Sequence, residues 1–582
     1  MLSFRWYGRS FLGHRNPVLL LVLLLFLFVS SPSGALRPYR YVDILNEKDD
    51  PAIEGTGGKA PEPADVQELY FVQRLDHFDP LNLHTYEQRY FYSDRYVGHE
   101  AAASSASSAS SVTFLCVGGE GPGFTKGVLL DSDHCTGDMI ELAKKLHEHY
   151  AINVHMYALE HRYYGKSYPA FGEKDSPVAT HNLKYLSSRQ ALEDLAHFVQ
   201  TKQSEQKGLG KEMRWVTFGG SYPGYMAGNA RLKHPDLIYA AVSNSAPLDL
   251  EVDFPGYNER VGWDLAYEKI GGSPQCLDIV QQGHLQAVAM LSTNATHLAE
   301  LFHVCNPETA LTKKGNQNLL LGDGLIEIYA QGNDPSCQEE LCNIEKLCHY
   351  IVTTSTDPSL TALDVLAQVA DKQRGDSDND NCRSVDFQEM LQELAQPVVK
   401  GFGWRSWLWQ TCTEVGFYQT CTHETCPYAM HYHTVDQDLK ICQAAYNITN
   451  VYENVQATRD YYGGLEISAG SRLLSVNGNV DPWSVLGLHT SPKYSLPVQM
   501  VAGASHHFWT HQVKETDAPE IQEIREYIYS VVMDWLGIET VVLQEQDTNT
   551  KRIEVSRPRD RNAANTGLRG TQDDVDRASL SA

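Results

Sequence analysis

The stretch Phe218–Gly224, which reads F-G-G-S-Y-P-G, decides the fold predicted for this chain. It follows the apolar run Trp215–Phe218 (W-V-T-F) and leads into the small-residue segment Tyr225–Ala230 (Y-M-A-G-N-A). A serine at a sharp turn between a strand and a helix exposes its hydroxyl, normally in the pattern G-x-S-x-G. Pro223 replaces the second glycine, and proline is tolerated in a first helical turn because its missing N–H would have no intrahelical partner. Ser221 is therefore a candidate nucleophile, and the alternative is an ordinary serine in a glycine-rich loop.

Short apolar runs and helical patterns alternate on both sides of this stretch. Ser188–Thr201 has apolar residues at helical spacing, and the remaining predicted strands are Val112–Val117, Val154–Leu159, Ala240–Ser243 and Leu473–Val476. Strands that alternate with helices predict an α/β fold, with a mostly parallel sheet and helices on both faces. A last helix is predicted from Asp517 as N-cap and Pro519 in its first turn to Gly537 at its end.

Residues 251–425 differ from the rest because they contain little that predicts a buried strand. Leu319–Ala330 and Thr361–Val369 have helix-like patterns, and most of the cysteines lie in this region. We therefore predict a mostly helical, disulfide-containing cap inserted into the α/β unit, whose two parts are residues 66–250 and 426–540.

Both ends of the chain have the composition of segments outside the folded core. Basic residues precede the twelve apolar residues Val18–Val29, and small residues follow, so residues 1–35 are predicted to be a secretory signal peptide. The alternative is an uncleaved membrane anchor, although twelve residues are short for a span. Residues 36–65 are predicted to be a polar leader, Ala101–Ser111 a surface loop, and 541–582 a disordered tail.

The net charge argues against nucleic-acid and membrane binding, and the cysteine content indicates disulfide bonds. The 582 residues carry a formal net charge of -26, which would repel nucleic acids and anionic membranes. The twelve cysteines of an exported chain are most simply disulfide partners. One cluster (Cys421, His423, Cys426, His431 and His433) could also hold zinc, but disulfide formation competes for its thiols. Asn294 (N-A-T) and Asn447 (N-I-T) are candidate N-glycosylation sites.

A catalytic serine needs a base and a group that orients the base. Asp481, in V-N-G-N-V-D-P-W, follows one predicted strand, and His506 and His507, in G-A-S-H-H, follow another. The order Ser, Asp, His, with each residue after a strand, is that of one large hydrolase fold, and it predicts a triad. The backbone N–H groups of Tyr222 and of the loop V-G-G-E-G-P-G, at Gly119, are the expected oxyanion donors.

Eight segments together resemble the family of serine peptidases that contains prolylcarboxypeptidase, dipeptidyl peptidase II and thymus-specific serine protease. They are Q-R-L-D-H-F (73–78), G-G-E-G-P (118–122), L-E-H-R-Y-Y-G-K-S-Y-P (159–169), L-K-Y-L-S-S-R-Q-A-L-E-D-L (183–195), G-G-S-Y-P-G (219–224), W-Q-T-C-T-E (409–414), N-G-N-V-D-P-W (477–483) and G-A-S-H-H (503–507). The resemblance implies an α/β-hydrolase fold with a helical cap, and exopeptidase cleavage of short peptides after proline. It assigns Ser221 as nucleophile, Asp481 as orienting acid and His506, rather than His507, as base.

Four further residues are candidates for substrate binding. Trp483 and Tyr225 could form the wall of a compact apolar pocket for proline, and the alternative is ordinary core packing. Glu120 and Glu414 could bind a substrate amine or serve as structural hydrogen-bond partners.

The expected protein is thus a secreted or lysosomal serine exopeptidase that acts on peptides and needs no metal or other cofactor. No nucleic acid, and no membrane after signal cleavage, is expected as a partner, and a homodimer is compatible with the sequence. The alternatives are a lipase or esterase on the same fold and a binding protein without turnover. The sequence leaves open whether a C-terminal residue or an N-terminal dipeptide is removed.

Overall fold

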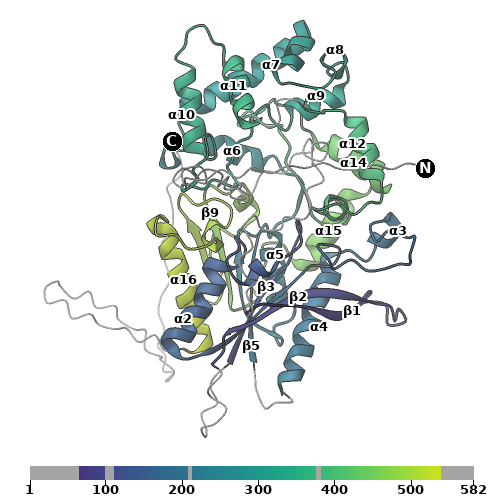
Figure 1. Cartoon of the computed structure of the whole chain (residues 1–582), viewed down its shortest axis with the longest axis vertical. Helices are drawn as coiled ribbons and strands as arrows, with labels where there is room; N and C mark the ends of the chain where they lie inside the picture. The colour runs from purple at the N-terminus through teal and green to yellow at the C-terminus, as the bar shows by residue number, and fades with distance from the viewer. Residues whose placement is uncertain (1–64, 99–110, 208–212, 375–381, 539–582) are drawn as a thin grey trace, which may run out of the picture. The chain divides into compact units, whose positions relative to one another are not determined.

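A single mixed sheet of eight strands organises the chain (Figure 1). The structure is a computed structural model that describes residues 65–98, 111–207, 213–374 and 382–538. The predicted signal peptide, leader, low-complexity loop and tail therefore lie almost entirely outside the described residues. The strands are β1 (Gln67–Arg74), β2 (Thr85–Tyr96), β3 (Ser111–Val117), β4 (Asn153–Leu159), β5 (Met213–Gly220), β6 (Ile238–Asn244), β9 (Leu473–Gly478) and β10 (Val498–Val501).

The strand order is β1-β2-β4-β3-β5-β6-β9-β10. All five predicted strands are present, and six strands from β4 to β10 pair in parallel. β1 and β2 add an antiparallel edge that the sequence analysis did not predict. A mostly parallel sheet with a strand-to-helix turn after β5 is the α/β-hydrolase fold, as expected.

Helices cover both faces of the sheet and bury alternate residues of each strand. On one face α4 (Ser188–Lys207) and α5 (Tyr222–Lys233) pack over residues such as Leu115 and Trp215. On the other face α2 (Glu141–Tyr150) and α16 (Pro519–Leu536) lie side by side over Phe114 and Phe218 (Figure 1). The predicted two-faced burial of the central strands is confirmed.

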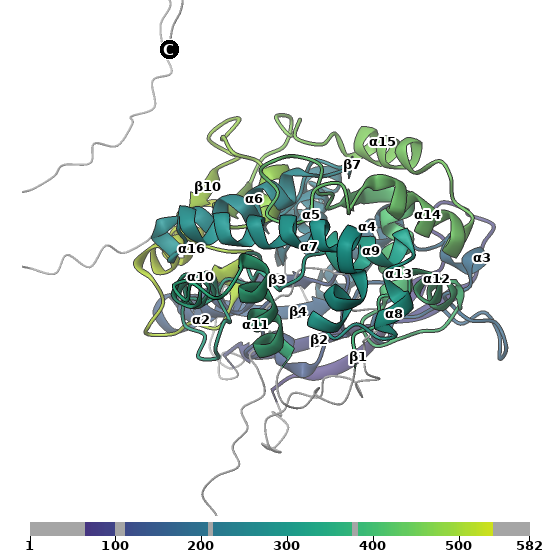
Figure 2. The ribbon, with the colours of Figure 1, turned by 90° about the horizontal axis from the view of Figure 1, so that it is seen from above.

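A long, mostly helical connection joins β6 to β9 and gathers at one end of the sheet. Its main helices are α6 (Gly256–Ala266), α7 (Pro274–Leu301), α8 (Pro307–Ala310), α9 (Lys314–Leu321), α10 (Ile344–Thr354), α11 (Ala362–Arg374), α12 (Phe387–Ala395), α13 (Trp404–Gln410), α14 (Val435–Tyr446) and α15 (Val451–Tyr462). Figure 2 shows α7 lying across the molecule from above. A two-stranded sheet of β7 (Glu251–Asp253) and β8 (Gly416–Tyr418) lies within this connection.

The helical connection is tied by disulfides, as predicted for an exported chain. The twelve cysteines form six bonds, which are Cys116–Cys135, Cys276–Cys348, Cys305–Cys382, Cys337–Cys342, Cys412–Cys442 and Cys421–Cys426. The described residues form one compact unit, and the sheet resumes only at Leu473. The boundaries at 250, 425 and 540 remain predictions.

Two local predictions were wrong. A helix was expected over Leu319–Ala330. The observed helix, α9, instead spans Lys314–Leu321 and ends before Gly322. Asp517 does not cap α16, whose N-cap is Ala518 with no side-chain bond. The Asp517 carboxylate instead accepts hydrogen bonds from Lys514 N at 3.0 Å and from the guanidinium of Arg525 at 2.5 Å, an ion pair that competes with capping.

The long segment 159–169, the most specific part of the family resemblance, has a structural role in the described fold. Arg162 is fully buried and donates from Nε and Nη2 to both oxygens of Asp194, at 2.6 and 2.7 Å. The same guanidinium donates to the backbone oxygens of Leu75, Tyr185 and Arg74. Every N–H donor of the buried Arg162 guanidinium has a partner, and removing one member of a buried ion pair is strongly destabilising. The Arg162–Asp194 pair therefore fixes the loop after β4 against α4.

Candidate active site

Ser221 occupies the turn between β5 and α5, as the motif predicts. β5 ends at Gly220 and α5 begins at Tyr222, so Ser221 alone makes the turn. Its φ of 64° and ψ of -135° are a strained conformation for a residue with a side chain. Pro223 lies in the first turn of the helix, where its missing N–H costs nothing.

Asn244, at the end of β6, fixes this turn by hydrogen bonds. Its backbone oxygen accepts the N–H of Ser221 at 2.9 Å. Its side-chain Nδ2 donates to Asp138 Oδ2 at 2.7 Å and to Gly219 O at 3.2 Å, and its Oδ1 accepts the indole N–H of Trp509 at 2.7 Å. Trp509 belongs to the segment that carries the candidate histidine, so one buried amide connects the serine turn to the histidine loop.

Asp481 and His506 form the second part of the site. Asp481 follows β9 and His506 follows β10, and His506 Nδ1 lies 2.9 Å from Asp481 Oδ1. The same Asp481 oxygen accepts the backbone N–H of Trp483, also at 2.9 Å, which fixes the carboxylate. Both side chains are almost fully buried, at 1% and 0% exposure. Within the described part of the chain, His506 Nε2 is buried and has no hydrogen-bond partner, so the hydrogen bond from Ser221 Oγ that a triad uses is not formed in this structure.

His507 has a different environment from its neighbour. Its Nδ1 contacts Thr510 Oγ1 at 3.1 Å, and its backbone N–H donates to Ser245 Oγ at 2.8 Å. Burial, together with the nearby histidines, holds the pKa of His507 well below its usual range. A methyl group added to Gly220 would lie 2.8 Å from the His507 ring, so the histidine loop packs directly against the residue before Ser221.

The glycine loop after β3 lies against the start of α5. A methyl group added to Gly119 would come within 2.3 Å of Pro223 Cγ, so this position admits no side chain without displacement. The Gly118 N–H donates to Leu159 O at 2.9 Å, which ties the loop to β4. The first N–H groups of a helix lack intrahelical partners, which leaves that of Tyr222 available at the serine turn.

The two candidate pocket residues lie in different surroundings. Trp483 is half-buried, and its ring lies 6.4 Å from that of His506, in contact with the rings of Phe254, Tyr257 and Phe417. Tyr225 is buried to 1% exposure behind Tyr222 and Tyr462. Trp483 therefore has the better position to contact a substrate.

The two candidate glutamates also differ. Both oxygens of Glu414 accept the N–H of Ser188, and its Oε1 accepts the Ser188 hydroxyl, so this side chain caps α4. Burial raises the pKa of Glu414 to about 7 against the opposing effect of these bonds. Glu120 is half-buried as a residue, yet its Oε2 is shielded from solvent and, in the described ranges, has no hydrogen-bond partner. Burial raises the pKa of Glu120 to about 7, opposed in part by its own backbone N–H and by the charge of His506.

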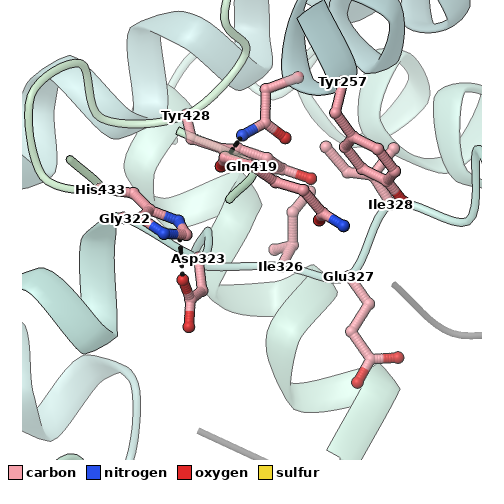
Figure 3. A pocket seen from close by; sticks show the side chains of 10 residues that line it. Tyr257, Gly322, Asp323, Ile326, Glu327, Ile328, Gln419, Tyr428 and His433 are labelled. Atoms are coloured by element: carbon pink, nitrogen blue, oxygen red, sulfur yellow. Dashed lines mark hydrogen bonds and ion pairs between the residues drawn. The ribbon is translucent and has the colours of Figure 1, made fainter. Parts of the chain in front are cut away.

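Tyr257 also lines a small cavity (Figure 3). Its volume is about 30 Å³, and Figure 3 shows Tyr257 and Ile328 on one side and His433 paired with Asp323 on the other. This is room for about one water molecule, so a proline ring does not fit.

The remaining candidate positions are explained by simple contacts. Cys421 and Cys426 are bonded to each other at 2.03 Å, so their thiols are not available to a metal. In residues 65–98, 111–207, 213–374 and 382–538, no group of three or more candidate ligands could hold a metal ion. Asn294 and Asn447 are both exposed, and glycosylation at these two sequons remains a prediction. No helix of the described ranges is long and apolar enough to span a membrane.

Comparison with known proteins identifies the family of the chain. The family model described as serine carboxypeptidase S28 matches residues 73–528. The chain is 32% identical to the thymus-specific serine protease of Mus musculus, covering 80% of this chain and 87% of that protein. It is 26% identical to the lysosomal Pro-X carboxypeptidase of Homo sapiens, covering 75% and 82%. A peroxisomal α/β-hydrolase of Saccharomyces cerevisiae superposes with a TM-score of 0.31 at 10% identity over 83% of this chain and 92% of that one, which is too low to add to the topology.

Proposed function

Because the chain belongs to the serine carboxypeptidase S28 family, we propose that this serine peptidase is a secreted or lysosomal exopeptidase that cleaves short peptides after proline. One observation carries the proposal: His506 is bonded to Asp481 through Nδ1, while Nε2 has no partner among the described residues. The His506 loop packs against the turn that presents Ser221.

In the proposed reaction Ser221 Oγ attacks the carbonyl carbon of the scissile peptide bond, and His506 Nε2 takes the hydroxyl proton. Asp481 holds the imidazole in the tautomer that leaves Nε2 free to accept, and it stabilises the imidazolium that forms. The N–H groups of Tyr222 and Gly119 stabilise the oxyanion. His506 then donates its proton to the leaving amine, and water hydrolyses the acyl-enzyme by the same steps in reverse.

We further propose that the half-buried ring of Trp483 forms the wall against which the proline ring packs. A proline residue offers a compact apolar ring but no backbone N–H donor. An aromatic surface next to the base is therefore a suitable contact for it. The ring of Tyr225 stacks on the ring of Tyr222, so Tyr225 is not proposed to contact the proline ring. Of the two glutamates, Glu120 is the one proposed to bind a substrate amine, because both Glu414 oxygens are already engaged by Ser188.

A peptide scan with the wild type and Ser221→Ala tests the proposal. The wild type should cleave either Xaa-Pro-reporter peptides, offered with free or acetylated N-termini, or Pro-Xaa peptides, and Ser221→Ala should cleave neither. The substrate class that is cleaved settles whether an N-terminal dipeptide or a C-terminal residue is removed. Turnover that survives Ser221→Ala would refute the mechanism. Preference for acyl esters without preference for proline would support a lipase or esterase, and lack of labelling by a fluorophosphonate probe would support a binding protein.

The proposed location has its own test. Export through residues 1–35 would expose the sequons at Asn294 and Asn447 to glycosylation in the secretory pathway. The protein purified from a eukaryotic culture should lose mass on treatment with a glycosidase that removes N-linked glycans. An unchanged mass together with retention inside the cytosol would contradict export.

A further inference from the structure

Gln331 belongs to the helical connection, yet it is tied to the candidate catalytic loop. It lies in the irregular segment between α9 and α10, and its backbone oxygen accepts the N–H of His506 at 3.1 Å. Two residues on, the backbone oxygen of Asn333 accepts the hydroxyl of Ser505 at 2.9 Å. These two bonds place the Gln331 side chain beside the base.

The orientation of the Gln331 amide is fixed by chemistry. The indole N–H of Trp483 lies 3.0 Å from Oε1, and the phenol hydroxyl of Tyr257 lies 2.8 Å from the same atom. An indole nitrogen can only donate, so the atom that it meets must be the amide oxygen. With both oxygen lone pairs engaged, the Nε2 amino group points away from Trp483 and Tyr257.

That amino group is a donor without a partner in the described part of the chain. Among the described residues no hydrogen bond involves Gln331 Nε2, and this atom is not one of the side-chain polar atoms that are both buried and unpaired. Gln331 as a whole is half-buried. Two N–H groups therefore face accessible space, on a residue whose backbone contacts the His506 loop and whose amide oxygen contacts Trp483.

We propose that Gln331 is a substrate-binding residue whose Nε2 donates a hydrogen bond to an acceptor oxygen of the bound peptide. The inference rests on the proposed peptidase function and adds a contact from the helical connection to it. The acceptor is either the carbonyl oxygen of the residue before proline or the terminal carboxylate of the leaving residue. Both are carbonyl-type oxygens that an amide N–H binds, and substrates that lack one or the other tell them apart.

The test compares two variants that differ in what they keep. Gln331→Glu retains acceptor oxygens for Trp483 and Tyr257 but removes the N–H donors, whereas Gln331→Met removes both. Tyr257→Phe is the matched control, because it removes one bond to Oε1 and leaves Nε2 in place. For each protein, kcat/KM is measured with Xaa-Pro-reporter peptides and with a small acyl ester that lacks both acceptor oxygens.

The ratio of peptide to ester kcat/KM is the decisive readout. A net hydrogen bond contributes about 1 kcal/mol, so we expect this ratio to fall about fivefold in Gln331→Met and further in Gln331→Glu, where a carboxylate faces the substrate oxygen. The fall should appear mainly in KM, and Tyr257→Phe should change the ratio less. An equal loss on peptide and ester in both variants would mean that Gln331 only positions Trp483 and the His506 loop, which would overturn the proposal.

Changing the substrate gives a measurement that does not depend on whether the variants fold. In the wild type, a peptide with the carbonyl before proline reduced to methylene should lose the same factor if that oxygen is the acceptor. A Pro-Xaa amide should lose it, relative to the acid, if the acceptor is the carboxylate. If neither change affects wild-type turnover beyond twofold, Gln331 does not bind the substrate. If the wild type cleaves no peptide in a Ser221-dependent manner, it is the proposed function that fails.

Discussion

The buried carboxyl group of Asp138 should make the stability of this protein depend on pH in a way that Asp138→Asn removes. Asp138 is 0% exposed, with Oδ2 bonded to Asn244 and Oδ1 unpaired among the described residues. Burial raises the pKa of Asp138 to about 7 from 3.8, against the bonds from Asn244 and backbone amides and the charge of Arg525. The native state therefore holds a proton that the unfolded chain releases above pH 3.8.

The sign follows from proton binding. Between pH 4 and 7 the native state binds more protons than the unfolded state, so the free energy of unfolding falls as pH rises. About three pKa units at ~1.4 kcal/mol each give a loss of about 4 kcal/mol, complete above pH 7. Asp138→Asn has nearly the same shape and no charge, so it should match the wild type near pH 4 and exceed it by up to about 4 kcal/mol at pH 8.

Urea denaturation with disulfides intact, at steps from pH 4 to pH 8, measures this difference. Both proteins should carry Ser221→Ala, so that no active peptidase degrades the unfolded chain during the experiment. A difference between the two proteins that stays within about 1 kcal/mol over the whole pH range would refute the claim that Asp138 is protonated in the native state.

Three further substitutions test the site. Asp481→Asn should lower kcat on Xaa-Pro-reporter peptides by about 10⁴, because the imidazole loses the partner that fixes its tautomer, and a loss below tenfold would contradict that role. Gly119→Ala should displace the glycine loop from Pro223 and lower kcat by about 10², the usual effect of losing one oxyanion donor, whereas the exposed control Gly98→Ala should not. Asn244→Ala should lower the free energy of unfolding by about 3 kcal/mol, because it leaves buried polar groups of Asp138 and Trp509 unpaired; urea denaturation at pH 5 that shows no change would count against the buried amide network.

The parts of the fold that could be predicted from sequence are those in which several neighbouring residues show the same pattern. The central strands are buried on both faces, so each reads as a continuous apolar run. β1 was missed because its exposure alternates, as on many edge strands; Val72, for example, is 62% exposed. β2 lies inside the sheet, but its sequence is not a continuous apolar run, because it includes the buried polar residues Gln88 and Arg89. The triad candidates could be selected because three reactive residue types each follow a strand, in the order Ser, Asp, His along the chain.

Single polar residues in the interior carry no such signal. Asn244 ends β6 in the run A-V-S-N-S, where a polar residue after a buried strand was a hint that remained unused. Gln331 has no sequence signal, because its role depends on Trp483, Tyr257 and His506 meeting it from distant segments. Asp517 is a case in which the sequence pattern was present but the prediction was wrong. The pattern predicted an N-cap, whereas the Asp517 carboxylate pairs with Arg525 instead.

The position of the helical connection has a consequence for biosynthesis. Ser221 lies before it, whereas Asp481 and His506 lie after it, in the segments that follow strands β9 and β10, which complete the sheet beside β6. A ribosome therefore synthesises Ser221, the proposed nucleophile, more than 250 residues before His506, the proposed base. If these roles hold, a nascent or truncated chain that ends before β9 would contain the serine without its proposed base, and it would have no peptidase activity.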